Sequence, residues 1–168
     1  MSETVTFQGK PLILIGESVN VGMQAPDFEV VSSDLKPVKL SDFKGKTKVI
    51  STFPSLDTPV CDLQVKEFNK RAASLSLDVV VIGISKDLPF AIKRFCSENG
   101  IKNEIVLSDY KTSSFGMSYG LLINELNLLA RSVQIIGKDD IVRYRQIVPE
   151  LTSPPDYDGA LEALKGVK

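Results

Sequence analysis

The chain has 168 residues, of which 43% are hydrophobic and 24% are charged, and its net charge is -1. This composition is typical of one soluble domain over residues 1–168, and the balanced charge favours neither a nucleic acid nor an anionic membrane as a partner. Because the chain has no histidine, Ser-His catalysis, Cys-His catalysis and histidine-ligated metal sites are excluded. The N-terminus lacks a secretion signal, and no apolar run approaches the roughly 18 residues of a membrane-spanning helix, so we expect a cytoplasmic protein.

The first half of the chain predicts five strands and one helix. Alternating apolar residues on both sides of Gln8-Gly9-Lys10 indicate an N-terminal hairpin, and a buried strand ends at Pro54. The predicted strands cover residues 3–8, 11–15, 27–32, 36–43 and 47–54. The helix follows at once, with Thr58 as N-cap and Pro59 at its first position, and continues to about Leu75.

The second half begins with a near-continuous β-branched run, "DVVVIGIS", which is typical of a central parallel strand. Asp87 is expected to cap the next helix, which Asn99-Gly100 should end. The predicted strands cover residues 78–85, 104–108, 131–137 and 141–148, and the predicted helices cover 88–98, 113–120 and 157–166. Strands and helices that alternate before a final hairpin predict an α/β fold, with a mixed sheet flanked by helices rather than a purely parallel one.

Cys61 is the candidate nucleophile, because it lies in the first turn of the helix that begins after Thr58. As the third helical residue, its sulfur should lie near the Thr58 hydroxyl. The free N–H groups and the partial positive charge of a helix N-terminus favour a thiolate over a thiol. A small buried hydrophobic residue is the alternative, but the strand, the threonine, the proline and the helix start together favour a reactive cysteine.

The stretch "FPSLDTPVC" fits the Pro-x-x-x-Thr-x-x-Cys signature of the peroxiredoxins, with Pro54, Thr58 and Cys61 in register. The segments "TVTFQGKPL", "SKDLPFAIKRFC", "YGLLINELNLLARSV" and "PDYDGALEAL" resemble the thiol peroxidase subfamily, of the atypical two-cysteine type, so the resemblance covers essentially the whole chain. It implies a thioredoxin-like fold with a central mixed β-sheet flanked by helices and an N-terminal β-hairpin extension over residues 1–16. It also implies a peroxidatic Cys61, a resolving Cys96 in the same subunit, and Arg131 in the same pocket.

Each implied role has a physical reason and a structural alternative. Pro54, which cannot donate a hydrogen bond, would shield the thiolate, although it could simply end a strand. Thr58 would hydrogen-bond the peroxide and can cap the helix at the same time. Arg131 would stabilise the thiolate and the leaving oxygen, although an arginine between apolar residues is usually a surface ion pair. Cys96 could equally fill the core, but it is the only other sulfur that could form an intramolecular disulfide.

The resemblance implies a thiol-dependent peroxidase that reduces hydrogen peroxide and organic hydroperoxides through a Cys61 sulfenic acid and a Cys61–Cys96 disulfide. Thioredoxin would be the reductant, the protein would be a homodimer, and no metal or organic cofactor would be required. Since one cysteine begins a helix and the other ends one, we expect local unfolding before the disulfide forms.

Two alternatives and one detail of the substrate remain open at this point. A thioredoxin-like disulfide oxidoreductase would need Cys-x-x-Cys, but Gln64 stands where the second cysteine would be. A redox sensor or switch without enzymatic turnover would also need a reactive Cys61 and stays possible. Three apolar residues before Arg131 favour bulky organic substrates: Leu121, Leu122 and Leu126.

Overall fold

A computed structural model describes residues 3–167, which form a seven-stranded mixed sheet with the order β11-β10-β5-β6-β7-β3-β4. Its strands are β3 (Glu29–Val31), β4 (Pro37–Lys39), β5 (Thr47–Thr52), β6 (Val79–Ser85), β7 (Ile105–Ser108), β10 (Ser132–Ile136) and β11 (Val142–Ile147). The central strands β5, β6 and β7 are parallel, whereas β10 runs antiparallel to both β5 and β11. The expected α/β class with a mixed sheet is therefore confirmed, and the organisation as one domain stays a prediction.

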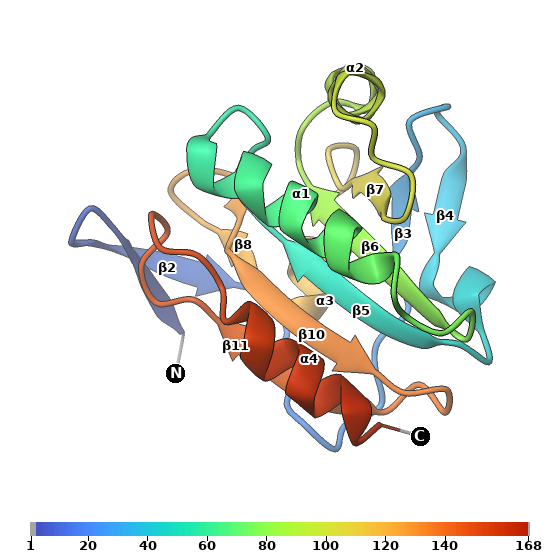
Figure 1. Cartoon of the computed structure of the whole chain (residues 1–168). Coiled ribbons are helices and arrows are strands. Elements are labelled where there is room, and N and C mark those ends of the chain that lie inside the picture. The colour runs from blue at the N-terminus through green and yellow to red at the C-terminus, as the bar shows by residue number, and fades with distance from the viewer. Residues whose placement is uncertain (1–2, 168) are drawn as a thin grey trace.

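Helices cover both faces of this sheet, and Figure 1 shows α1 and α4 crossing its front while α3 lies behind it. The helices are α1 (Pro59–Ala72), α2 (Pro89–Glu98), α3 (Ser114–Tyr119) and α4 (Tyr157–Lys165). Phe68 of α1 and Ala160 of α4 pack with Val49, Val133 and Ile135 of the sheet in one buried cluster. Val49 on β5 and the alternate aliphatic side chains of β10 thus fix which face the two long helices cover.

The N-terminal hairpin is confirmed as β1 (Thr4–Phe7) and β2 (Lys10–Ile15). It extends into a second sheet of order β1-β2-β8-β9, in which β8 (Leu122–Ile123) and β9 (Leu128–Leu129) form a hairpin that was not predicted. Residues 1 and 2 of the expected extension lie outside the described residues. The extension therefore pairs with the segment before Arg131, far along the chain.

The end of one predicted strand was wrong, because Leu40–Phe43 form a short 3-10 helix, η1, rather than the end of a strand over 36–43. The Asp42 carboxylate accepts a hydrogen bond of 2.8 Å from the Lys39 N–H, and this bond turns the backbone out of the extended conformation. The alternation of apolar residues, on which the predicted strand was based, gives no indication of this hydrogen bond between Lys39 and Asp42.

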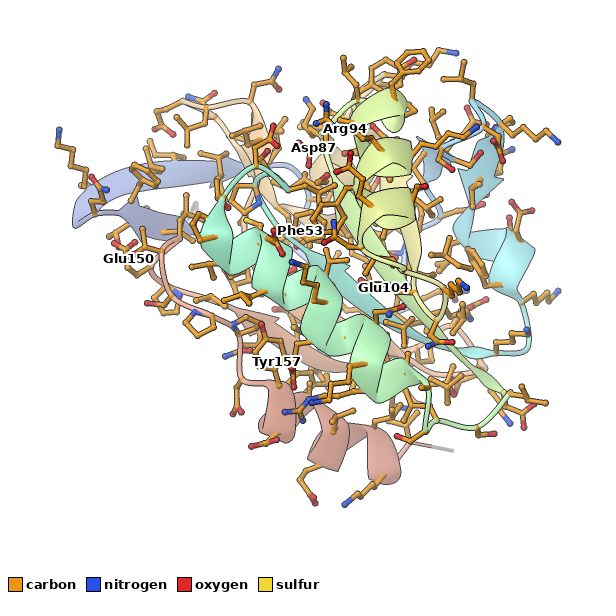
Figure 2. The ribbon with its side chains drawn as sticks, turned by 45° about the horizontal axis from the view of Figure 1, so that its top comes forward. Phe53, Asp87, Arg94, Glu104, Glu150 and Tyr157 are labelled. Carbon is orange, nitrogen blue, oxygen red and sulfur yellow. The ribbon has the colours of Figure 1, made fainter. Side chains whose placement is uncertain are left out.

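The predicted cap of α2 was also wrong, since Leu88 is the N-cap and no side chain caps the helix. The Asp87 carboxylate instead accepts hydrogen bonds from Ser55 Oγ at 2.7 Å, Leu56 N at 2.9 Å and Ser85 Oγ at 2.6 Å. Asp87, labelled in Figure 2, thus lies at the junction of β6 and α2 and ties it to the loop that follows β5. This loop leads directly into α1.

Gly120, which ends α3 with a φ of 66°, offers a test of the close approach between α3 and the segment after β2. A β-carbon there would overlap the carbonyl oxygen of Glu17. We expect Gly120→Ala to lower the free energy of unfolding in urea by at least about 2 kcal/mol, since the left-handed conformation alone costs an alanine roughly 1–2 kcal/mol. Gly9→Ala is the control, because Gly9 has a φ of 83° but open space around it; an equal loss in both variants would contradict the close approach.

Candidate active site

Cys61 lies in the first turn of α1, as its position after Thr58 and Pro59 predicts. Thr58 is the N-cap, with an extended backbone, and the first helical bond runs from the Asp62 N–H to the Thr58 carbonyl at 3.0 Å. The backbone N–H of Cys61 precedes this bond and is one of the free donors of the helix N-terminus. The Cys61 side chain is fully buried, so its sulfur meets the helix N-terminus away from bulk water.

The Thr58 side chain does not cap α1, contrary to the prediction. Its hydroxyl donates a hydrogen bond to the Ser55 carbonyl at 3.0 Å, across the turn that precedes the helix. Pro59 at the next position has no N–H, so one of the usual targets of a capping oxygen is missing. Because the hydroxyl proton is engaged, the exposed Thr58 oxygen keeps its lone pairs for another donor.

Arg131 meets Cys61 directly, with Nη2 at 3.2 Å from Sγ. The guanidinium also donates to the Gln64 Oε1 at 2.8 Å and, from Nη2, to the Leu151 carbonyl at 2.7 Å. The side chain is only 2% exposed, and within residues 3–167 no carboxylate forms an ion pair with it. A buried cation with neutral partners favours an anion beside it, and the anion that this site can provide is the Cys61 thiolate.

Gln64 is a site residue that the sequence reasoning missed. It lies on the same face of α1 as Cys61, and its Nε2 donates to Ser51 Oγ at 2.6 Å and to the Thr52 carbonyl at 3.0 Å. Gln64 therefore holds the Arg131 guanidinium against the end of β5. The sequence could have indicated Gln64, because it is a polar residue on the buried face of a helix. It could not have indicated Leu151, because the contact with Arg131 uses the backbone carbonyl, which every residue has.

A cavity of about 240 Å³ opens beside this pair and is lined by Pro54, Thr58 and Arg131 together with apolar side chains. Phe7 from the N-terminal hairpin and Leu151 from the loop after β11 are among the apolar ones. The structure thus brings Pro54, Thr58 and Arg131 to one opening, with the Cys61 sulfur behind it.

The leucines expected to favour bulky substrates do not line this cavity. Leu121 and Leu122 are buried in the core between the two sheets, and Leu126 is exposed in the turn between β8 and β9. The apolar surface beside Arg131 is supplied instead by the N-terminal hairpin and by α1, through Phe7 and Val60. The apolar character was predicted, but the residues that provide it were wrong.

Cys96 belongs to the same apolar cluster as Cys61, here called the cysteine cluster. Its buried members are Phe53, Leu56, Cys61, Val65, Ile92 and Val106, with Phe95, Cys96 and Ile101 packed against them. Both cysteines are free thiols. Burial, together with a smaller effect of the nearby Glu104 carboxyl, raises the pKa of Cys96 to about 11, so Cys96 stays protonated at neutral pH. The two sulfurs thus have different chemistry within one cluster.

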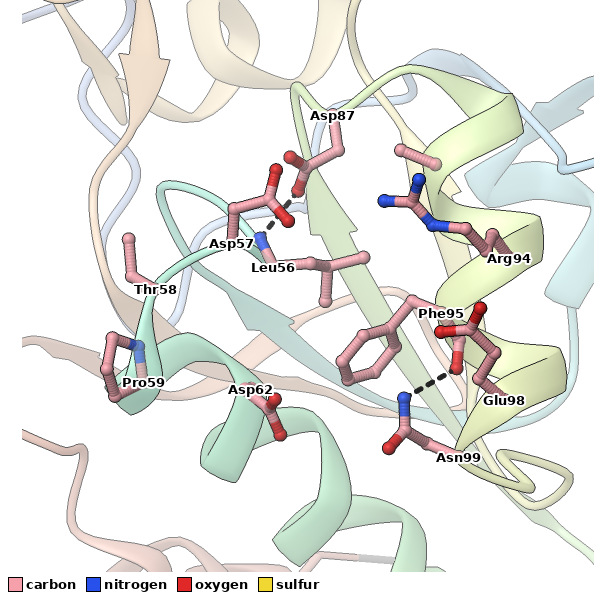
Figure 3. A pocket seen from close by; sticks show the side chains of 11 residues that line it. Leu56, Asp57, Thr58, Pro59, Asp62, Asp87, Arg94, Phe95, Glu98 and Asn99 are labelled. Carbon is pink, nitrogen blue, oxygen red and sulfur yellow. Dashed lines mark hydrogen bonds between the residues drawn. The ribbon is translucent and has the colours of Figure 1, made fainter.

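A second cavity, of about 560 Å³, separates the start of α1 from α2, and Figure 3 shows it between Asp62 on one side and Arg94 and Glu98 on the other. Leu56 and Phe95 line it and also belong to the cysteine cluster. These two side chains therefore border both this cavity and the cysteine cluster.

Within residues 3–167 no group of three or more histidine, cysteine, aspartate or glutamate side chains is arranged to hold a metal ion. Over the same range, each helix is too short or too polar to cross a membrane.

Comparisons with known proteins identify the family of the chain. The family model described as Redoxin matches residues 20–161. A thiol peroxidase from Staphylococcus haemolyticus is 48% identical over 163 residues, which are 97% of this chain and 98% of that protein. A thiol peroxidase from Halalkalibacterium halodurans is 49% identical over 162 residues, 96% of this chain and 97% of that one.

Solved structures give the same result for the fold. A peroxiredoxin-like protein from Aquifex aeolicus superposes with a TM-score of 0.92 at 41% identity and covers 98% of both chains. A thiol peroxidase from Chromobacterium violaceum has a TM-score of 0.86 over 97% of this chain and 95% of its own, and at 22% identity it supports the fold alone. The expected thioredoxin-like fold is confirmed. With two near-full-length curated relatives almost half identical, the chain belongs to the Redoxin family and, within it, to the thiol peroxidases of the peroxiredoxins, and it is a thiol-dependent peroxidase.

Proposed function

We propose that this peroxidase reduces hydrogen peroxide and organic hydroperoxides with Cys61 as the attacking sulfur and Cys96 as the resolving one. The observation that carries the proposal is the buried Arg131 guanidinium, which lies 3.2 Å from the Cys61 sulfur and has no carboxylate partner within residues 3–167. An arginine held in this way stabilises both a thiolate and the negative charge that develops when a peroxide bond breaks.

In the first step, the Cys61 thiolate attacks one peroxide oxygen, so that an S–O bond forms while the O–O bond breaks. The leaving oxygen takes a proton and departs as water or an alcohol. Thr58 orients the peroxide by accepting a hydrogen bond from its O–H, because the Thr58 proton is already donated to Ser55. Pro54 lines the opening without offering a donor that would hold water there.

In the second step, the Cys96 thiol attacks the sulfenic acid, and the disulfide forms with loss of water. Cys96 lies in the last turn of α2 and Cys61 in the first turn of α1, so we expect at least one of these turns to open first. The raised pKa of Cys96 supports this order of events, since a thiol that stays protonated in the closed protein does not compete for peroxide.

In the third step, an external dithiol of the thioredoxin type reduces the disulfide by thiol exchange. We assign no metal or organic cofactor to the cycle. The apolar walls from Phe7 and Leu151 support organic hydroperoxides as substrates.

A homodimer and a cytoplasmic location follow from the family resemblance. The exposed Leu63 on α1, beside a cavity that Val60 and Tyr157 also line, supports an interface near the active site.

A redox switch is the second candidate, because its disulfide would use the same pair of sulfurs. Rapid-mixing oxidation with hydrogen peroxide and an alkyl hydroperoxide, under recycling by thioredoxin, separates the two. Sustained turnover supports the peroxidase cycle, whereas one oxidation without recycling would identify a switch.

Arg131→Ala should decrease the fraction of Cys61 present as thiolate at neutral pH and slow the first oxidation on the order of 100-fold, since a buried charge-assisted donor is lost. The thiolate absorbance and the rate of peroxide-dependent oxidation measure both effects. Arg131→Lys is the matched variant, because it keeps the charge but loses the fork that also holds Gln64. Unchanged thiolate absorbance in the alanine variant, with the fold intact by circular dichroism, would remove Arg131 from the mechanism.

Thr58→Ser and Thr58→Val separate the hydroxyl from the shape of the side chain. The serine variant should react with peroxide at nearly the parent rate, whereas the valine variant should be slower because it cannot accept the peroxide hydrogen bond. Since Thr58 does not cap α1 through its side chain, the valine variant should lose only about 1 kcal/mol of unfolding free energy with its bond to Ser55. Equal oxidation rates in the two variants would make Thr58 purely structural.

Cys61→Ser should abolish the first oxidation, and Cys96→Ser should leave it fast but stop recycling by thioredoxin. Intact mass after one equivalent of peroxide reports the outcome. The parent should lose two hydrogens, and Cys96→Ser should gain one oxygen. If Cys96→Ser turned over at the parent rate, Cys96 would be a core residue and the protein a single-cysteine peroxidase.

A further inference from the structure

Glu104 is a buried acid that the cycle described above does not use. It is 5% exposed, and neither carboxyl oxygen has a hydrogen-bond partner among residues 3–167. Gly83 on the neighbouring strand makes room for it, because a β-carbon there would lie 2.6 Å from Glu104 Oε1 and 3.5 Å from the ring of Phe53. Figure 2 labels Phe53 and Glu104 where α1 and α2 run over the sheet. The carboxyl therefore occupies a hollow beneath the helices.

Glu104 directly precedes β7 and continues its alternation toward the side of the sheet that holds both cysteines, since Glu104 is buried, Ile105 is exposed and Val106 is buried. Side chains two residues apart on a strand share a face, so Glu104 lies on the same face as Val106. Val106 is a buried member of the cysteine cluster, and it pairs in register with Gly83. The electrostatic effect of Glu104 on the pKa of Cys96 agrees with this placement.

The charged and titratable groups around Glu104 offer it no partner. Cys96 on α2 is near enough for the Glu104 charge to affect its pKa, and α1 contributes Cys61, whose sulfur lies 3.2 Å from Arg131. Of the neighbouring strands, β6 presents Gly83 at this point, and the residue that follows β5 there is the uncharged Phe53. Lys102, on the adjoining loop, is exposed. The closed arrangement thus leaves the carboxyl both desolvated and unpaired, which costs free energy that hydration would restore.

We propose that Glu104 is a positioning residue for the resolving step: it destabilises the closed packing of α2 over the sheet and so favours the open segment from which Cys96 reaches the Cys61 sulfenic acid. The inference rests on the proposed function, since it assigns the device that sets the rate of disulfide formation. The covalent step itself is unchanged. A sulfur–sulfur bond forms, the sulfenic S–O bond breaks, and the hydroxyl leaves as water with the Cys96 proton.

The direction of the pH dependence follows from burial. Burial raises the pKa of Glu104 well above its usual value, so the closed state keeps the proton. As the pH rises past the ordinary carboxyl range, the open state ionises and the closed state does not. The closed state therefore loses stability as the pH rises toward the raised pKa, and α2 should open more often.

Hydrogen exchange of the reduced protein tests this without any peroxide. From about pH 6 to about pH 8, protection of α2 amides, corrected for intrinsic exchange, should fall on the order of tenfold in the parent and stay nearly constant in Glu104→Gln. Glu98→Gln is the matched control, because it removes an exposed acid from the same helix and should behave as the parent. The same pH profile in the parent and in Glu104→Gln would overturn the inference.

A second variant covers the case in which the glutamine variant folds poorly. Glu104→Met keeps an unbranched side chain but fills the hollow with apolar atoms. It should protect α2 more strongly, slow disulfide formation at least about fivefold, and increase sulfinic acid at Cys61, while the first oxidation keeps its rate. Disulfide formation at the parent rate would overturn the inference. If no variant reduced peroxide but α2 opening still followed Glu104, the proposed cycle would fail and the control of α2 by Glu104 would stand.

Discussion

A buried guanidinium without a carboxylate partner has to be held by neutral groups, and much of this site serves that purpose. Gln64 from α1 and the Leu151 carbonyl from the loop after β11 both accept hydrogen bonds from Arg131. Gln64 is in turn fixed by Ser51 and Thr52 at the end of β5. Among residues 3–167 no carboxylate pairs with this charge, so in the proposed cycle the order of the mixed sheet, which brings β5 beside β10, supports the reactivity of Cys61.

The two cysteines share one apolar cluster but differ in what lies next to them. Cys61 has a cation and a helix N-terminus, whereas Cys96 has burial and a nearby acid, which together keep it protonated. In the proposed cycle, this contrast supports Cys61 as the first sulfur to react more strongly than the positions of the two residues along their helices do. In that cycle, the time between oxidation and resolution would depend on how easily α2 opens.

Periodicity predicted the central strands, the four α-helices and the N-terminal hairpin, because each is long enough to show a repeating apolar pattern. The β8–β9 hairpin was missed, since its strands have two residues each. The side-chain caps of Thr58 and Asp87 were wrong because the loop after β5 offered both groups other partners. The local pattern of strand, threonine, proline and helix start identified Cys61, whereas Arg131 was identified only through the family resemblance. Glu104 was not identified, because its burial depends on the space that Gly83 leaves on the neighbouring strand.

Anchors on both sides of α2 limit how far its opening can spread. Asp87 is held at one end through the Ser55 and Ser85 hydroxyls, and at the other end Asn69 Oδ1 accepts hydrogen bonds from the N–H groups of Lys102 and Asn103. In the proposed cycle, the segment that carries Cys96 is therefore a short tether closed at both ends. A tethered thiol meets its target at a high effective concentration. Disulfide formation in this protein would then be governed by the length of the tether rather than by the amount of thiol in the surroundings.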